Sequence, residues 1–217
     1  MKGSFTLIQN LLTLLIIPFL ACIVGIAAVP AIALFTELRE ALSNGEYWID
    51  HLATGISLGM SIVAWGVTLV ILCGALGGLL RPRLDPGRYP LESFLTIQWA
   101  WSMVFHKIAL FFLPHLVPSF IGNLYYRLSG ARIGRGAQIN TPNVNDAGSV
   151  TIGERVVIGD GALIGTGSIV QPGCTIGEGA VVASRAVVPK WTEIPPGETW
   201  GGIPAKCIRL ADGSKPE

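Results

Sequence analysis

The chain contains three histidines, at His51, His106 and His115. Histidine is the side chain best suited to general-base chemistry near neutral pH. On a helix, Gln98, Ser102 and His106 would follow at intervals of four residues and form one polar stripe through an apolar surface. His106 is therefore the first candidate base for removing a proton from a hydroxyl or amine, and His115, between two prolines, is another. In the alternative interpretation, His106 reaches lipid headgroups as an ordinary interfacial residue.

A second candidate site is the polar stretch 140–151, which contains Pro142 and Gly148. It should form a bulge or loop, and loops on rigid scaffolds often carry sites. Asn145 and Asp146 could bind an acceptor or orient a base, and a buried carboxylate with a raised pKa could itself be the base. A solvated turn, which Asn, Asp and Gly favour, is an equally good interpretation.

The element that would position these residues is a repeat, in which an aliphatic side chain returns at every sixth position. The aliphatic positions are Ile152, Ile158, Ile164, Val170, Ile176, Val182, Val188 and Ile194. This period predicts a coil with three short strands per turn and the aliphatics stacked inside a narrow prism. Counting back six from Ile152 gives Asp146, so the polar stretch around it should not fill the prism. A flexible glycine-rich linker is excluded, because it would not keep Ile or Val at a fixed period.

Two further positions of the repeat are occupied by small residues. The residue after the aliphatic is often glycine, which we expect at a sharp turn with positive φ; examples are Gly153, Gly159, Gly165 and Gly177. Four residues after the aliphatic, a small side chain should fit a corner of the prism; examples are Ala162, Ser168, Cys174, Ala180 and Ala186.

The repeat resembles the hexapeptide-repeat acyltransferases over about residues 131–209, and the closing segment 201–209 is similar to that family's Gly-Asn-Pro-Ala-Lys ending. The resemblance implies an all-β, left-handed parallel β-helix of about four coils, usually a homotrimer, that binds acetyl-CoA between neighbouring prisms. The positions that match the family's CoA groove are Ala183, Ser184, Lys190, Ala205, Lys206 and Arg209.

The chain departs from the family pattern because all its histidines precede residue 131. Members of the family generally carry a basic histidine in or beside the β-helix, so here the base would come from another segment, or there is no catalysis. The same absence argues against the zinc carbonic anhydrases that share this β-helix, and we expect no metal.

The junction Tyr125–Gly134, Tyr-Tyr-Arg-Leu-Ser-Gly-Ala-Arg-Ile-Gly, is also loosely similar to the membrane-bound terminal region of homopoly-amino-acid synthetases. That similarity implies acyl transfer to an amine.

The composition indicates a membrane protein: of 217 residues, 51% are hydrophobic and 13% charged, and the mean hydropathy is +0.57. The runs 5–35 and 52–80 are long enough to cross a bilayer. In the second run, Gly55-x-x-x-Gly59 and Gly74-x-x-x-Gly78 should pack against the first helix. A net charge of +1 gives no nucleic-acid signal, and four cysteines without a C-x-x-C pair indicate a reduced compartment.

Arg81, Arg83 and Arg88 follow the second run, and Lys2 precedes the first. By the positive-inside rule both ends of the hairpin are cytoplasmic, most simply at a bacterial inner membrane, with the β-helix facing the cytoplasm. The third apolar stretch, 94–121, is interrupted by polar residues and prolines and should lie in the interface or re-enter it.

The sequence thus predicts four parts: a transmembrane hairpin (1–90), an interfacial or re-entrant segment (91–129), the β-helix (130–210) and a flexible tail (211–217). The predicted function is transfer of an acetyl or related acyl group from CoA to a membrane-associated acceptor such as a lipid-linked glycan. Alternatives are a non-catalytic trimeric membrane scaffold and an amide-forming module related to poly-amino-acid synthetases.

Overall fold

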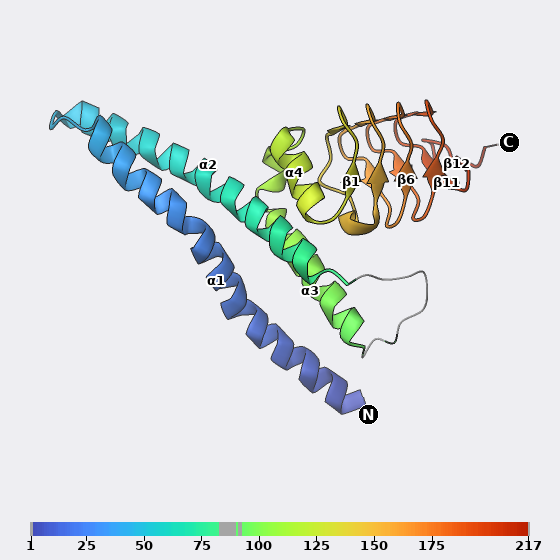
Figure 1. Cartoon of the computed structure of the whole chain (residues 1–217), viewed down its shortest axis with the longest axis horizontal. Helices are drawn as coiled ribbons and strands as arrows, with labels where there is room; N and C mark the ends of the chain where they lie inside the picture. The colour runs from blue at the N-terminus through green and yellow to red at the C-terminus, as the bar shows by residue number, and fades with distance from the viewer. Residues whose placement is uncertain (1, 83–89, 91–92, 217) are drawn as a thin grey trace. The chain divides into compact units, whose positions relative to one another are not determined.

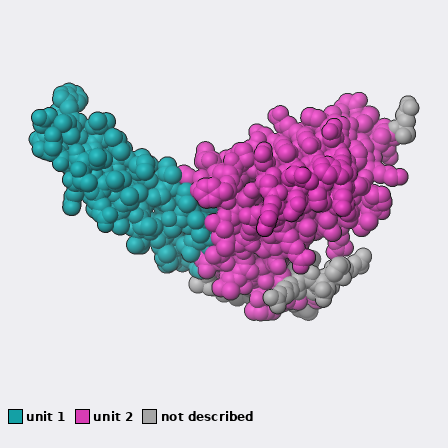
Figure 2. All heavy atoms as spheres, turned by 45° about the horizontal axis from the view of Figure 1, so that its top comes forward, with its two compact units in different colours: residues 1–72 teal, residues 73–217 magenta. Residues whose placement is uncertain are grey.

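The computed structural model describes residues 2–82, 90 and 93–216, and the side chains of residue 14 and of residues 16 onward within those ranges. The chain forms two compact units, residues 1–72 and 73–217, shown in Figure 2. Arg83 and Arg88, on which the predicted orientation partly depends, lie outside the described residues, and of Lys2 only the backbone is described.

Two long helices account for the first apolar runs. Helix α1 spans Lys2–Leu42 and α2 spans Tyr47–Leu80, with the boundary between the units inside α2. Both are long and apolar enough to cross a membrane, over Ile16–Leu42 and Tyr47–Leu80. The stretch 36–51 between the two apolar runs is mostly helical, because both helices continue into it. Only residues 43–46 are non-helical, and the Asp50 carboxylate accepts hydrogen bonds from the backbone N–H groups of Asn44 and Gly45 at 3.2 Å.

The third apolar stretch is divided into short helices. It comprises α3 (Phe94–Ala109), the 3-10 helix η1 (Leu113–His115) and α4 (Phe120–Leu128). Ser93 and Ser119 cap α3 and α4, each accepting hydrogen bonds from backbone N–H groups of the first turn. Pro114 and Pro118 lie between the two α-helices, where a missing N–H is tolerated.

The β-helix follows at once (Figure 1). Its strands are β1 (Arg132–Ile133), β2 (Gln138–Ile139), β3 (Thr151–Ile152), β4 (Val157–Ile158), β5 (Leu163–Ile164), β6 (Ile169–Val170), β7 (Thr175–Ile176), β8 (Val181–Val182), β9 (Val187–Val188), β10 (Glu193–Ile194), β11 (Thr199–Gly202) and β12 (Ala205–Arg209). They form three sheets with the orders β1-β3-β6-β9, β10-β7-β4-β2 and β12-β11-β8-β5. All pairs are parallel except β11–β12, which closes the stack. The predicted solenoid of about four coils is confirmed.

The interior of the prism is built as the repeat predicts. Every aliphatic position from Ile152 to Ile194 is at most 2% exposed. The small residues four positions later are fully buried, and these are Ala162, Ser168, Cys174, Ala180 and Ala186. Since each coil contributes only part of this column, its apolar surface is covered only when the coils stack.

The glycines that follow the aliphatic positions were predicted to have positive φ, and this reason for glycine was wrong. The residues with positive φ lie three positions after the aliphatic, as at Gly161 and Gly179 (both φ 63°), and not one position after it. Gly159 and Gly165 are required by close approach instead. A Cβ on Gly159 would lie 2.6 Å from Glu178 N, and one on Gly165 would lie 2.5 Å from Ser184 N, in the next coil.

Within the second unit, helix α4 covers the start of the stack, beside β1 (Figure 1). The buried Tyr126 hydroxyl donates to the carbonyl of Thr141 at 2.7 Å, and the Asn123 side-chain amide donates to that of Ala137 at 2.9 Å. These bonds attach α4 to the first coil.

The glycine pairs of α2 do not behave as predicted. A Cβ on Gly74 would lie 3.0 Å from a Tyr125 ring carbon, and one on Gly78 would lie 1.9 Å from the carbonyl oxygen of Leu128. The nearest neighbours of this pair therefore belong to α4 and its end. A Cβ on Gly55 or Gly59 would have no heavy atom within 4 Å.

Candidate functional site

His106 lies on α3 against a tyrosine of α4. Its Nδ1 is 2.7 Å from the Tyr125 hydroxyl oxygen, and the two rings are stacked with centroids 6.0 Å apart. Tyr125 is 2% exposed, whereas His106 is only partly buried. The imidazole is thus held by its Nδ1 side against the helical core.

The environment of His106 favours the neutral imidazole. Burial lowers the pKa of His106, the negative charge of Asp146 raises it, and Lys107 lowers it. Burial raises the pKa of Tyr125, and this effect is larger than the lowering of that pKa by a hydrogen bond from Ser129. The phenol therefore keeps its proton at neutral pH. In the tautomer in which Nδ1–H donates to the Tyr125 hydroxyl oxygen, Nε2 carries the free lone pair.

Asp146 connects α3 to the β-helix. Its Oδ1 accepts a hydrogen bond from the Trp99 indole N–H, and its Oδ2 accepts one from the Thr166 hydroxyl, both at 2.9 Å. Trp99 belongs to α3 and Thr166 follows β5, so one carboxylate joins three separate segments. The structure therefore brings His106 and Asp146, which the sequence offered as separate candidates, into one electrostatic site.

The interior position of the first coil is occupied by Val144 and not interrupted at Asp146. Val144, 1% exposed, pairs with Ile164 and fills the interior position. Arg132 pairs with Thr151, nineteen residues on, whereas Thr151 pairs with Ile169, eighteen residues on. Val144 and its partner Ile164 are twenty residues apart, so the first coil is longer than the next by one residue at Arg132 and by two at Val144, and counting back by six fails there.

The residues after Val144 form the predicted bulge. Asp146 has φ 45°, and the 3-10 helix η2 (Ala147–Ser149) follows it. Asp is one of the few non-glycine residues that adopts this left-handed conformation readily. The strand direction is thereby interrupted, and the carboxylate is available to Trp99 and Thr166.

The other two catalytic candidates lie apart from this network. The Asn145 side chain is exposed, and its backbone N–H donates to the carbonyl of Ile164 at 3.0 Å. His115 is exposed in η1, edge-on to the Phe112 ring with centroids 5.7 Å apart. Within the described residues, neither side chain is hydrogen-bonded to His106.

Sequence reasoning missed Tyr125, Trp99 and Thr166 as parts of the site. Tyr125 was visible only as part of the junction resemblance, and Trp99 only as an apolar residue of α3. Thr166 follows Gly165 at an ordinary corner of the repeat. Nothing in local sequence links these three residues, which meet only after the coil and the helices pack.

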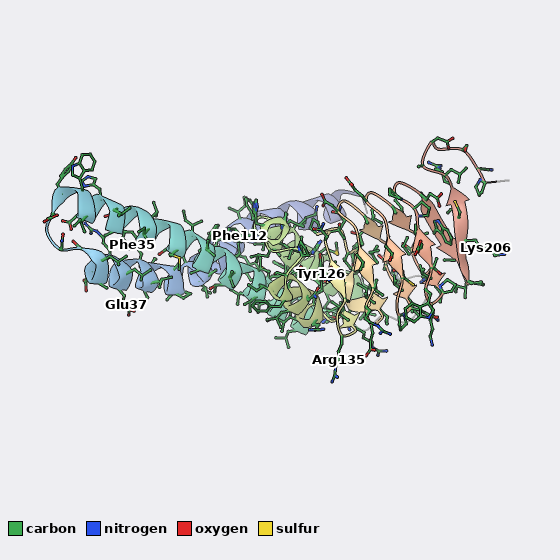
Figure 3. All side chains as sticks on the ribbon, turned by 90° about the horizontal axis from the view of Figure 1, so that it is seen from above. Phe35, Glu37, Phe112, Tyr126, Arg135 and Lys206 are labelled. Atoms are coloured by element: carbon green, nitrogen blue, oxygen red, sulfur yellow. The ribbon has the colours of Figure 1, made fainter. Side chains whose placement is uncertain are left out.

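The predicted CoA-groove residues lie near the other end of the stack. Figure 3 shows Lys206 at the opposite end from Tyr126. Lys206 is exposed on β12 and pairs with Gly201 of β11, while Ala205 is buried. Arg209, which pairs with Thr199, is exposed and ends the same strand. Two cations on one closing strand are suited to bind phosphate groups.

The remaining groove candidates occupy two corners of the prism. Ala183 and the exposed Ser184 follow β8, where the chain turns toward the sheet that contains β9. Lys190 is exposed after β9, at the next corner, where the chain turns toward β10. One chain therefore does not gather Ser184 and Lys190 at a single corner. In the residues that the structure describes, no cluster of three or more His, Cys, Asp or Glu side chains could hold a metal ion.

The repeat region has a recognisable family signature. Residues 155–190 match the family model described as bacterial transferase hexapeptide (six repeats). No curated protein sequence matches the chain. Residues 155–190 of the β-helix are thus hexapeptide repeats like those of bacterial transferases, which confirms the resemblance predicted from the sequence.

Solved structures of similar proteins include a hexapeptide transferase family protein from Anaplasma phagocytophilum, with 28% identity over 37% of this chain and TM-score 0.25; the chain spans only 55% of that protein. The soybean serine acetyltransferase has 20% identity over 81% of this chain and 82% of that chain, with TM-score 0.31. A serine acetyltransferase from Brucella abortus strain S19, in complex with coenzyme A, has 18% identity over 82% of this chain and 81% of that chain, with TM-score 0.30. These TM-scores are too low to carry an argument about this site.

Proposed function

We propose that the chain is a membrane-anchored acyltransferase that carries an acetyl or related acyl group from CoA to a hydroxyl or amine of a membrane-associated acceptor, such as a lipid-linked glycan. The observation that carries this proposal is the joint site of His106 and Asp146, formed by α3 and the first coil of a transferase-type β-helix. The base that the repeat lacks would be supplied by the helical segment.

In the proposed reaction, the acceptor oxygen or nitrogen attacks the thioester carbonyl carbon while Nε2 of His106 takes its proton. The carbon–sulfur bond then breaks, and the imidazolium returns the proton to the leaving CoA thiolate. Tyr125 would hold the imidazole through Nδ1, and the Asp146 charge would stabilise the imidazolium. General-base catalysis of this kind contributes about 10²–10⁴-fold to the rate.

The layout of the stack supports this assignment. Lys206 and Arg209 lie on the closing strand, and His106 lies beside α4, which covers the first coil. The first and fourth coils are three steps apart, about 14 Å at ordinary strand spacing. A CoA molecule with its phosphates at the closing strand would extend its thioester arm along the stack toward His106. Family members are commonly trimers, and a neighbouring prism would bring a second corner to this groove.

The two apolar helices support a membrane location. Their exposed large apolar side chains include Ile17, Ile26, Val29, Ile32, Leu52, Leu58 and Val63. Because β-helices of this type need no membrane to fold, an anchor indicates that the acceptor is presented at the bilayer. The proposed location is the bacterial inner membrane, with the β-helix facing the cytoplasm.

Calorimetric titration of acetyl-CoA into the full-length protein in detergent tests the proposal. We expect saturable binding that is weakened at least tenfold by Lys206→Ala and less by Lys190→Ala. Lys215→Ala, which removes the same charge from the tail, is the matched control and should bind normally. His106→Ala should retain binding but release the CoA thiol at least 100-fold more slowly in the presence of a membrane-lipid extract.

The competing function is a non-catalytic scaffold, favoured by the absence of histidine from the β-helix. A folded protein that binds no acetyl-CoA would overturn the transferase proposal in favour of the scaffold. Equal thiol release by the wild type and His106→Ala would instead remove His106 from the mechanism.

A further inference from the structure

The residue that follows the second apolar helix is an arginine in an unusual setting. Arg81 comes directly after Leu80, the last residue of α2, and its side chain is partly buried. Its Nη1 lies 3.4 Å from the carbonyl oxygen of Gly130, which is the one hydrogen bond of this side chain among the described residues. At that distance the bond is weak, so the guanidinium retains most of its donors for a ligand.

The guanidinium of Arg81 lies against the backbone of two glycines, Gly130 and Gly148. A Cβ on Gly148 would be 1.8 Å from Nη1 of Arg81, and one on Gly130 would be 2.3 Å from it. Any other residue at either position would displace the side chain. The arginine therefore lies directly on the backbone of η2, two residues beyond Asp146.

The same arginine borders an open hollow of about 550 Å³. The hollow is lined by Gly78, Leu79, Arg81, Pro82, Leu95 and Gln98. Four of its lining residues are apolar, and the other two supply one cation and one amide. A ligand that fits this lining carries an anion and an apolar chain on the same molecule.

We infer that this hollow binds the phosphate group of a lipid, and that this lipid is the acceptor of the proposed reaction; this inference rests on the proposed function. Arginine binds phosphate through paired N–H donors, and the Gln98 amide can donate to a further oxygen. Arg81 follows a helix that is long and apolar enough to cross a membrane, so it would lie at the depth of lipid phosphates.

The position of the hollow relative to His106 defines the size of the acceptor. Gln98 and His106 lie on α3, eight residues apart, which corresponds to about 12 Å along the helix. A phosphate held at Gln98 and Arg81 would thus place the reacting hydroxyl or amine about 12 Å farther along the molecule. The acceptor class is a lipid phosphate or diphosphate that bears a polar group of that length, such as a sugar.

Binding of dioctanoyl phosphatidic acid to the full-length protein in detergent, followed by native mass spectrometry, tests the site without CoA. Dioctanoylglycerol, which lacks the phosphate, and inorganic phosphate, which lacks the chains, are the two comparison ligands. We expect phosphatidic acid to bind at least tenfold more tightly than either. Comparable binding of the diacylglycerol would show an apolar surface only, and tight binding of inorganic phosphate would show a site for a soluble anion; either result overturns the inference.

The variants locate the binding on the molecule. Arg81→Gln should weaken phosphatidic acid binding at least tenfold, and Gly148→Ala should weaken it by displacing the guanidinium without changing the charge. Arg135→Gln, an exposed arginine that points away from the first coil in Figure 3, is the control and should change binding less than twofold. Unchanged affinity in a folded Arg81→Gln protein, or an equal loss in Arg135→Gln, would refute the site.

The two proposals fail in different ways. If phosphatidic acid binds through Arg81 but acetyl-CoA does not bind, the lipid-phosphate site stands and the transferase proposal fails. If acetyl-CoA binds and the lipid does not, the transferase acts on an acceptor held elsewhere.

Discussion

Two alanine substitutions in the repeat, Gly165→Ala and Gly179→Ala, test which requirement for glycine is stronger. At Gly165 the requirement is close contact with the next coil, and at Gly179 it is positive φ. Gly165 has no positive φ, but a Cβ there would lie 2.5 Å from Ser184 N and 2.8 Å from the carbonyl carbon of Ala183. Gly179 has φ 63°, and a Cβ there would meet no heavy atom within 4 Å. Gly165→Ala therefore requires the next coil to move by about 1 Å to regain ordinary van der Waals contact, whereas Gly179→Ala requires only a left-handed alanine.

The cost of each change follows from these contacts. Inserting a methyl group into a close-packed site costs about 1–3 kcal/mol, and displacing the coil also weakens the 2.8 Å bond from Gly165 N to the carbonyl of Val182, worth about 1 kcal/mol. Gly165→Ala should thus cost about 2–4 kcal/mol. Gly179→Ala should cost about 1–2 kcal/mol, the price of the left-handed conformation. The effect of alanine on the unfolded chain is common to both and cancels.

Thermal unfolding of the two variants, followed by the β-sheet circular dichroism signal in detergent, measures the difference. For a unit of about 150 residues, such as 73–217, each kcal/mol lowers Tm by about 2–4 °C. The midpoints of the two costs differ by about 1.5 kcal/mol, so the Tm of Gly165→Ala should lie roughly 3–6 °C below that of Gly179→Ala. If Gly179→Ala is the less stable variant, positive φ is the dominant requirement and the close-approach argument is wrong.

Two further changes test the site and its register. Because the Asp146 charge raises the pKa of His106, Asp146→Asn should lower that pKa and move the acid limb of the kcat/KM profile to lower pH; an unmoved or upward-shifted limb would show that Asp146 does not act on His106. Val144→Ala should cost about 2 kcal/mol in unfolding free energy, since Val144 is buried, whereas exposed Asn145→Ala should cost less than about 0.5 kcal/mol. Equal losses in denaturant unfolding would contradict the assigned register.

The coil could be predicted from the sequence because its rule is local and repeated. Each aliphatic position, such as Ile158 or Ile176, has the same environment as the position one coil away, so the period alone identifies the interior. The role of the glycines could not be predicted in the same way. A glycine required by φ and one required by the neighbouring coil look identical in sequence, and only the distance from Gly165 to Ser184 distinguishes them.

The register of the first coil could not be predicted because the extra residues of that coil change which side chain is interior. Counting by six assigned the interior to Asp146, but the pairing of Val144 with Ile164 shows that a buried aliphatic was available two residues earlier. The chain takes that option because burying valine is favourable, whereas burying a carboxylate in an apolar prism is costly. Strict periodicity therefore failed in this coil, whereas the hydrophobic effect correctly favours Val144 over Asp146 as the interior residue.

The extra residues of the first coil also explain why a site can form at this end of the stack. Where the repeat is regular, each interior position is occupied by a buried aliphatic side chain, and no carboxylate at that position is available to another element. In the first coil, the bulge after Val144 allows Asp146 to accept hydrogen bonds from Trp99 and Thr166. The bond from Trp99, a residue of α3, attaches that helix to the coil. The attached helix carries His106, so on the proposed function the base missing from the repeat would be supplied by the segment closest in sequence to the predicted membrane spans. On the proposed function, transfer would then take place at the end of the stack covered by α4, where a lipid-borne acceptor is accessible.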